Sequence, residues 1–183
     1  MAASDSLVRL AARGDREALT RLVLRLLPRV RNLVRYLIRG DRDVDDVAQE
    51  AVVAVLRGLG TYRGQGSFES WADRVTARAT FAWLRKRRAD EARELEVARL
   101  EATHGDDGAA PDEYACRRQA VRLLDALPLE QRHVLVLHHV VGMSVSEVAD
   151  HLGAPAETVR SRLRLAKQRL LSLGSSFKRQ EAG

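Results

Sequence analysis

Apolar residues recur at the three- and four-residue spacing of amphipathic helices along most of the chain. Such stripes run through residues 19–26, 30–38 and 44–59, and another begins at Phe68 and continues into a basic stretch. This spacing places the apolar residues on one face of a helix, which a folded protein buries. Because no segment alternates apolar and polar residues convincingly with period two, the pattern predicts an all-α protein.

Two breaks divide this helical pattern. The first, at 58–66, contains four of the twelve glycines and predicts a loop. The second precedes Pro111; it is charged at its start, lacks a clear apolar stripe and ends in glycine and alanine. Such a composition is typical of an interdomain linker, partly helical at its start. We therefore expect two small helical domains at 1–89 and 113–174, a flexible linker at 90–112 and a tail at 175–183.

Composition excludes several classes of protein. No apolar run approaches the ~20 residues that a membrane-spanning helix requires, and the N-terminus lacks the pattern of a secretion signal, so a cytoplasmic protein is expected. Cys116 is the only cysteine, which rules out an intramolecular disulfide. Lys and Arg outnumber Asp and Glu by 31 to 25. Since such an excess alone is weak evidence for nucleic-acid binding, the positions of the charges decide.

The segment from Ser144 to Leu170 has the signals of a helix-turn-helix. Ser144 and Glu147 stand at the positions of a capping box, which starts a short helix. Gly153 is placed to end that helix, and Pro155 suits the first position of the next one. Two helices joined by a short turn with glycine form the motif that places its second helix in the DNA major groove.

The second helix of this motif has a buried and an open face. Its apolar stripe at 159, 163, 166 and 170 is expected to face the core. Arginines on the other face suit both guanine edges and phosphates. A basic helix that only packs on a core is the alternative, but the capping box, glycine turn and proline start favour DNA binding. The expected DNA contacts are Glu157, Thr158, Arg160, Ser161, Arg164, Leu165, Lys167 and Gln168.

Five of the eight aromatic residues cluster beside the glycine loop, ahead of a run of four cations at 85–88. Aromatic rings stack on unpaired bases and cations follow the backbone, so this composition suits a single-strand site. Core packing is the simpler explanation for Trp71 and Phe81, whereas Tyr62 and Phe68 lie in or beside the loop. The candidate single-strand contacts are Tyr62, Arg63, Phe68, Trp71, Arg74, Arg78, Arg85 and Lys86.

The order of these motifs resembles that of bacterial extracytoplasmic-function (ECF) sigma factors, group IV of the sigma-70 family, over nearly the full chain. Residues 45–51 (DDVAQEA) are similar to the part of region 2.2 that faces the β′ clamp helices of RNA polymerase. Residues 59–71 resemble the loop and helix that capture the −10 element. Residues 126–132 resemble the start of region 4, and 157–163 its −35 recognition helix.

The resemblance implies an alternative sigma factor. Such a protein directs core RNA polymerase to specific promoters, starts transcription there, and is commonly controlled by an anti-sigma factor. The implied partners are core polymerase, through its β′ clamp helices and β flap, and promoter DNA, with no membrane insertion. The expected polymerase contacts are Asp45, Asp46, Gln49 and Glu50.

Three positions depart from the family's pattern. Arg78 stands where relatives often have an asparagine that helps hold a flipped base, so the base pocket must differ. Leu165 replaces a usual arginine, which removes a contact with a base or the backbone. A leucine there either touches a thymine methyl group or is merely exposed. Gly60 replaces an acidic or other polar residue and is expected to loosen the loop.

Two other functions fit parts of the sequence. An ordinary helix-turn-helix regulator would bind duplex DNA without polymerase, but residues 45–51 and the Tyr62 loop argue against it. An enzyme acting on nucleic acid would need a Walker loop, zinc-spaced histidines or a catalytic triad, and none is found. His138 and His139 point to different helix faces, and the aspartates at 41–46 lack the spacing of a calcium loop. We expect no catalytic residue, metal or cofactor.

Overall fold

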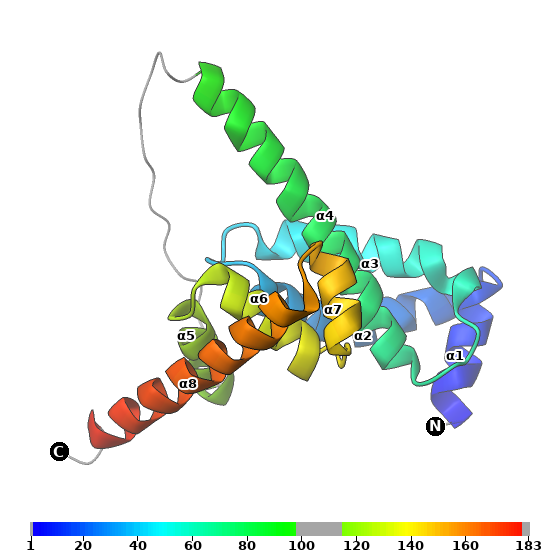
Figure 1. The fold of residues 1–183 in the computed structure, drawn as a ribbon. Helices are drawn as coiled ribbons and strands as arrows, with labels where there is room; N and C mark the ends of the chain where they lie inside the picture. The colour runs from blue at the N-terminus through cyan, green and yellow to red at the C-terminus, as the bar shows by residue number, and fades with distance from the viewer. Residues whose placement is uncertain (1, 98–114, 181–183) are drawn as a thin grey trace. The chain divides into compact units, whose positions relative to one another are not determined.

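The computed structural model of the chain describes residues 2–97 and 115–180. Every secondary-structure element in these two stretches is a helix, which confirms the all-α prediction. The chain divides into two compact units, Met1–Ala110 and Pro111–Gly183. Each is described here by itself (Figure 1). Most of the predicted linker, residues 98–112, lies outside the described residues.

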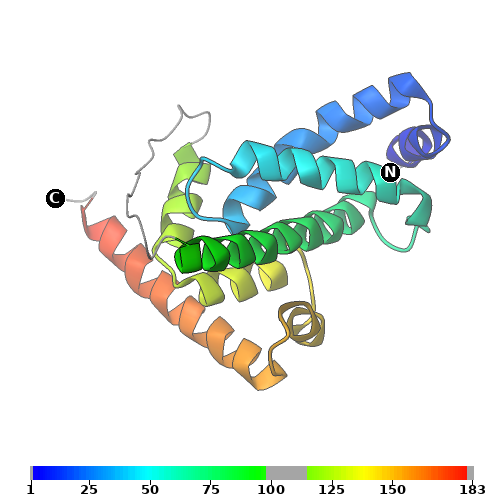
Figure 2. The ribbon, with the colours of Figure 1, turned by 90° about the horizontal axis from the view of Figure 1, so that it is seen from above.

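In the first unit the chain reverses direction between long helices. Figure 2 shows α2, α3 and α4 lying side by side, with α1 against the start of α2. Arg25 and Arg29, one turn apart on α2, pair with Glu69 and Asp73, one turn apart on α4, so these two helices run parallel. The elements are α1 (Ala2–Ala12), α2 (Arg16–Leu37), α3 (Val44–Gly58), the 3-10 helix η1 (Leu59–Thr61) and α4 (Phe68–Val97).

The core of the first unit consists of the apolar stripes of these helices. Leu22, Val30 and Val34 from α2 are at most 2% exposed, and so are Val47 and Ala51 from α3. The two stripes expected from the sequence are therefore buried face to face. Small residues on α3 let its neighbours approach closely, which brings α3 and α4 side by side along the unit.

The glycine-rich break is shorter than its composition predicts. Helix α3 continues through Gly58, and η1 follows directly, so the irregular segment begins only at Tyr62. Within that segment Gly64 and Gly66 have φ of +74° and +88°, the left-handed region that residues with a Cβ rarely adopt. These two glycines reverse the chain and return it to the start of α4.

The second unit places the helix-turn-helix on a supporting helix. Helices α6 and α7 both pack against α8, and Val134, Leu137, Val148 and Val159 are fully buried. Arg132 is also fully buried, and it is ion-paired to Asp125. The elements are α5 (Ala115–Asp125), α6 (Leu129–His139), α7 (Val145–Leu152) and α8 (Ala156–Gln180).

Two helices extend past the boundaries expected from the sequence. Helix α4 continues from residue 89 to Val97, because 91–96 consists of Glu, Ala, Arg and Leu, which are good helix formers, although the segment lacks an apolar stripe. Helix α8 continues from 174 to Gln180, and no proline interrupts it. In the described parts of the chain, no helix is long and apolar enough to cross a membrane.

Candidate nucleic-acid and partner interfaces

The helix-turn-helix formed by α7 and α8 has the capping box at its start and the glycine in its turn that the sequence predicts. The Glu147 N–H donates to the Ser144 hydroxyl at 3.2 Å, and the Ser144 N–H donates to a Glu147 carboxylate oxygen at 2.8 Å. This reciprocal capping box is the predicted one. Gly153 ends α7 with φ of +62°, and Pro155 lies one residue before the first residue of α8. The turn therefore starts α8 at a defined position beside α7.

Helix α8 turns its apolar stripe inward and a row of polar side chains outward. Val159, Leu163 and Ala166 are at most 8% exposed. The carboxylate of Glu157 accepts from the Arg160 guanidinium, in an ion pair whose side chains are 82% and 57% exposed. Thr158 is half-buried. The other predicted DNA contacts are exposed: Glu157, Arg160, Ser161, Arg164, Leu165, Lys167 and Gln168.

The far part of this exposed row is fixed to the supporting helix. The Arg169 guanidinium donates to the Gln131 side-chain oxygen at 3.1 Å, and Gln131 is 8% exposed on α6. Arg169 is thus occupied within the unit, which distinguishes it from Arg164 and Lys167, five and two residues earlier. The basic run on α8 thus contains Arg169, which is bonded to Gln131, and exposed cations such as Arg164 and Lys167, a division that the run of cations alone does not reveal.

Three aromatic rings hold the loop between η1 and α4. The Tyr62 ring lies 5.4 Å from that of Phe68 and 5.6 Å from that of Trp71, and the Phe68 and Trp71 rings are 5.5 Å apart. The Tyr62 hydroxyl donates to the Gly66 carbonyl at 2.9 Å, across the turn. The cluster and this hydrogen bond give the glycine-rich loop a defined shape.

Phe68 requires a correction. The sequence grouped it with Tyr62 as a ring open to a base, but Phe68 is 3% exposed and belongs to the core of the first unit. It sits at the first position of α4, where the helix directs it inward. Tyr62 and Trp71 are partly exposed and pack against that core. Phe68 therefore supports the other two rings and does not face solvent.

Gly58 is a residue of this cluster that the sequence analysis did not single out. A Cβ at this position would lie 3.2 Å from Cζ2 and 3.3 Å from Cη2 of Trp71. Those distances are too short for an undisturbed contact, so a side chain at 58 would push the Trp71 ring. A glycine at the end of a helix can have several roles. Only the structure shows that the absence of a side chain at Gly58 leaves room for the Trp71 ring.

The cations of α4 fall into separate groups. Arg74, Arg78 and Arg85 share one face of the helix by their spacing of four and seven, and the latter two are exposed. Arg87, although it lies in the same basic run, stacks 5.2 Å from the centre of the Trp83 ring and is ion-paired to Asp43. Arg63 is exposed in the loop. Arg78 and Arg85 thus form an exposed cationic row along α4, and Arg87 holds α4 to the start of α3.

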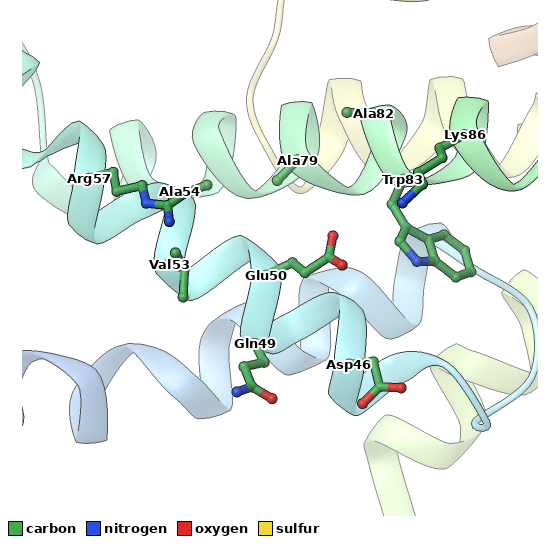
Figure 3. A pocket seen from close by; sticks show the side chains of 10 residues that line it. All are labelled: Asp46, Gln49, Glu50, Val53, Ala54, Arg57, Ala79, Ala82, Trp83 and Lys86. Carbon is green, nitrogen blue, oxygen red and sulfur yellow. The ribbon is translucent and has the colours of Figure 1, made fainter.

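A groove runs between α3 and α4 (Figure 3). Its lining takes Asp46, Gln49, Glu50 and Arg57 from α3 and Trp83 and Lys86 from α4, together with alanines from both helices and one valine. In the described residues, Asp46 and Glu50 form no ion pair. The groove is lined by Asp46, Gln49, Glu50, Val53, Ala54, Arg57, Ala79, Ala82, Trp83 and Lys86.

The four expected polymerase contacts do not all lie in this groove. Asp46, Gln49 and Glu50 do, but Asp45 is ion-paired with Arg31 of α2. Adjacent residues on a helix point 100° apart, which turns Asp45 away from the groove. Lys86, expected to follow the single strand with Arg85, lines the groove instead for the same reason.

The first half of α4 is fixed by ion pairs that no local sequence pattern predicts. Arg29 of α2 and Asp73 of α4 form two hydrogen bonds, and the Asp73 side chain is 7% exposed. The hydrogen bond to Asp73 raises the pKa of Arg29 above its ordinary value, against the effect of burial. The pair keeps the start of α4, and with it Trp71, in place against α2.

The described residues bring no three His, Cys, Asp or Glu side chains together in a way that could hold a metal ion. Near the start of α3, Asp43 and Asp45 are each ion-paired with an arginine. The candidate surfaces are thus a groove, an aromatic loop and an exposed helix face.

Two family descriptions match the chain. Residues 22–89 match "Sigma-70 region 2" and residues 117–170 match "Sigma-70, region 4". The first covers the groove and the aromatic loop, and the second covers the helix-turn-helix.

Several characterised proteins are similar over most of their length. The chain is 34% identical to the ECF RNA polymerase sigma factor SigM of Mycobacterium tuberculosis over 160 residues, which cover 87% of this chain and 79% of that one. It is 31% identical to the ECF RNA polymerase sigma-E factor of Escherichia coli over 175 residues, covering 88% and 89%.

Solved structures show the same arrangement of helices. CnrH, solved in complex with the cytosolic domain of CnrY, is 28% identical with a TM-score of 0.55, and the match covers 95% of this chain and 98% of CnrH. The sigma factor RpoE of Bartonella quintana, solved with the anti-sigma factor NepR, has a TM-score of 0.61 at 20% identity, over 85% and 96%. With the two sigma-70 regions in their order and these relatives along nearly its whole length, the chain belongs to the ECF sigma factors of the sigma-70 family.

Proposed function

We propose that this protein binds core RNA polymerase through the groove between α3 and α4 and directs it to promoters. There the Tyr62 loop and the arginine face of α4 hold a melted −10 strand, and α8 reads the −35 element in the major groove. The protein acts in the cytoplasm, catalyses no reaction of its own and needs no metal or cofactor. The two domains are the units that contain regions 2 and 4.

The groove carries this proposal. Asp46 and Glu50 are carboxylates on an open surface with no ion pair in the described residues, beside the indole of Trp83 and an apolar floor. A protein that only bound duplex DNA would gain nothing from carboxylates there, since they repel phosphate. A partner helix with basic and apolar residues fits the groove, in line with the expected β′ clamp contact. The charge pattern thus favours a polymerase subunit over an independent regulator.

The melted strand needs a place for an extruded base. Extruding a base costs a few kcal/mol, which stacking on an aromatic ring offsets. Tyr62 on the loop and Trp71 in the first turn of α4 are partly exposed rings, and Arg78 and Arg85 follow Trp71 at intervals of seven residues along α4. Arg78 can hold the strand by binding a phosphate or by stacking on a base. A charged side chain would thus take the place of the asparagine that relatives often have at this position.

An anti-sigma factor is the expected regulator. A protein that covers the α3–α4 groove would block polymerase directly, because the same carboxylates and indole would be buried. The relative CnrH was solved in complex with the cytosolic domain of CnrY, which supports a protein partner for this chain as well. We propose that the partner competes with polymerase for this groove.

Adjacent aspartates provide a matched test. Asp46→Lys and Asp45→Lys make the same charge change in the first turn of α3, but only Asp46 lines the groove. We expect Asp46→Lys to weaken binding of the full chain to core polymerase about tenfold or more, and Asp45→Lys to change it about twofold at most. Equal losses, or specific duplex binding by a chain that never joins polymerase, would overturn the proposal.

A further inference from the structure

An apolar side chain lies in the middle of the DNA-facing surface of α8. Leu165 is 38% exposed, whereas Leu163, two residues earlier, is 8% exposed and faces the core. A single exposed leucine on a protein surface needs no explanation. This one is notable for its neighbours, because it is surrounded by the side chains that would enter a major groove.

Helix geometry divides the exposed residues of α8 into two flanks. With 100° per residue, three cations fall on one side of the helix and three uncharged residues on the other, where Arg162 and Arg169 lie beside them nearer the core. Beyond the uncharged flank the surface turns toward α6, where Arg169 donates to Gln131. The two sets are Arg160, Arg164 and Lys167 on the first flank and Thr158, Ser161 and Leu165 on the second.

The two flanks suit different parts of a DNA duplex. Cations bind phosphate oxygens or guanine edges, whereas a leucine offers no hydrogen bond. If Leu165 covered a guanine, cytosine or adenine edge, it would leave a polar atom without water or a partner, which is unfavourable. The C5 methyl group of thymine is the one apolar group that a base pair presents in the major groove.

We propose that Leu165 packs against the C5 methyl group of one thymine in the −35 element, and that it is a specificity-determining residue of this protein. The inference rests on the proposed function, because it requires α8 to lie in the major groove. It assigns to Leu165 a preference for thymine at one position. A leucine that was merely exposed would not affect which base is bound there. It also separates the tasks on α8: the cationic flank holds the duplex and the uncharged flank reads it.

Deoxyuridine tests this contact, because it differs from thymidine only by the missing methyl group. Holoenzyme formed from the full chain and core polymerase would first select a promoter from a random duplex library. Each thymine of the selected −35 element would then be replaced in turn by deoxyuridine, and the affinity of the holoenzyme measured. At one position we expect about a fourfold loss for the unmodified chain, the effect of exposing one buried methyl group.

Three variants show whether the lost methyl group was in contact with Leu165. Leu165→Ala should bind the thymine and deoxyuridine duplexes equally at that position, and Leu165→Met should restore the preference. Leu171→Ala is the matched control: Leu171 is 75% exposed, two turns further along α8, and its loss should leave the fourfold effect intact.

The possible results separate this inference from the proposed function. If no thymine shows the effect, or if Leu165→Ala keeps it, Leu165 does not read a methyl group, although α8 can still bind the promoter. If the holoenzyme selects no −35 element at all, the proposed function of α8 fails and this inference fails with it.

Discussion

Arg29 and Asp73, 44 residues apart in the chain, share two hydrogen bonds of 2.7 and 2.6 Å between α2 and α4. The pair is asymmetric: the Arg29 side chain is 49% exposed and that of Asp73 only 7%. Water can therefore hydrate the Arg29 guanidinium when Asp73 is removed. It has little access to the Asp73 carboxylate when Arg29 is removed. The two residues contribute differently to the stability of the first unit.

This asymmetry predicts unequal effects of two truncations. We expect Arg29→Ala, which leaves a buried carboxylate unpaired, to lower the free energy of unfolding by about 2–3 kcal/mol, and Asp73→Ala by about 1 kcal/mol. Urea denaturation followed by circular dichroism measures both. Arg25→Ala, which breaks the more exposed pair with Glu69, should cost no more than about 0.5 kcal/mol. Equal costs for the first two variants would contradict the argument from burial.

Arg85 and Arg87 lie in one basic run but are predicted to differ in role. Arg87→Ala removes the contact with the Trp83 ring and the ion pair with Asp43, so we expect a loss of about 1 kcal/mol in the free energy of unfolding. Arg85→Ala should leave stability unchanged. It should instead reduce the salt dependence of holoenzyme binding to a −10 single strand, by about 0.7 in the logarithmic slope.

The measurements are a titration of a labelled oligonucleotide at several salt concentrations and a denaturation curve for each variant. If Arg85→Ala destabilised the fold and Arg87→Ala changed only the slope, the division of the basic run would be reversed.

The Tyr62 hydroxyl is predicted to matter for promoter opening. Tyr62→Phe keeps the ring contacts but removes the hydrogen bond to the Gly66 carbonyl, which closes the loop. We expect opening to slow by roughly two- to tenfold, the usual worth of one such bond, with unchanged binding to core polymerase. Fluorescence of 2-aminopurine in the −10 element follows the opening rate. The same substitution at Tyr36, on α2, is the control and should leave the rate unchanged.

Gly58→Ala should reproduce the slow opening, because its methyl group would push on Trp71. Normal opening in both variants would show that the loop finds its shape without the aromatic cluster.

The capping box is predicted to stabilise α7 specifically. Ser144→Ala removes an acceptor for the Glu147 N–H and should cost about 1 kcal/mol. Ser146→Ala changes an exposed serine in the same helix and should cost less than about 0.5 kcal/mol. Hydrogen exchange of the α7 amides measures the local effect. Equal exchange in the two variants would mean that packing on α8 alone holds α7 in place.

Local patterns predicted the elements of this fold better than the assignment of single side chains. The stripes of α2 and α3, the capping box and the buried face of α8 follow from spacing along one helix and lie where expected, although Leu170 at the end of the α8 stripe is only half-buried. Pairs such as Arg29 with Asp73 join separate helices, so no periodicity reveals them. The same holds for Gly58 beside Trp71.

The candidate site was predicted in outline and differs in detail. Phe68 looked accessible because it follows a loop, but the first position of α4 points inward. Asp45 looked equivalent to Asp46 because both are acidic, but only the latter lines the groove. A run of charged residues shows that charge is present in a segment. The position of each residue around the helix axis determines which partner its side chain contacts.

The ion pair of Glu157 with Arg160 has a consequence for how a promoter is found. On DNA, Glu157 would compete with phosphate for the same guanidinium. Such a tethered competitor weakens attachment to arbitrary DNA, where phosphate attraction supplies nearly all of the affinity. Each visit to a wrong sequence is then brief, and the search moves on. At the right sequence, base contacts from the other flank of α8 would compensate for the phosphate affinity that is lost while Glu157 occupies Arg160. A single acidic residue could thus speed the search for a promoter without contacting any base.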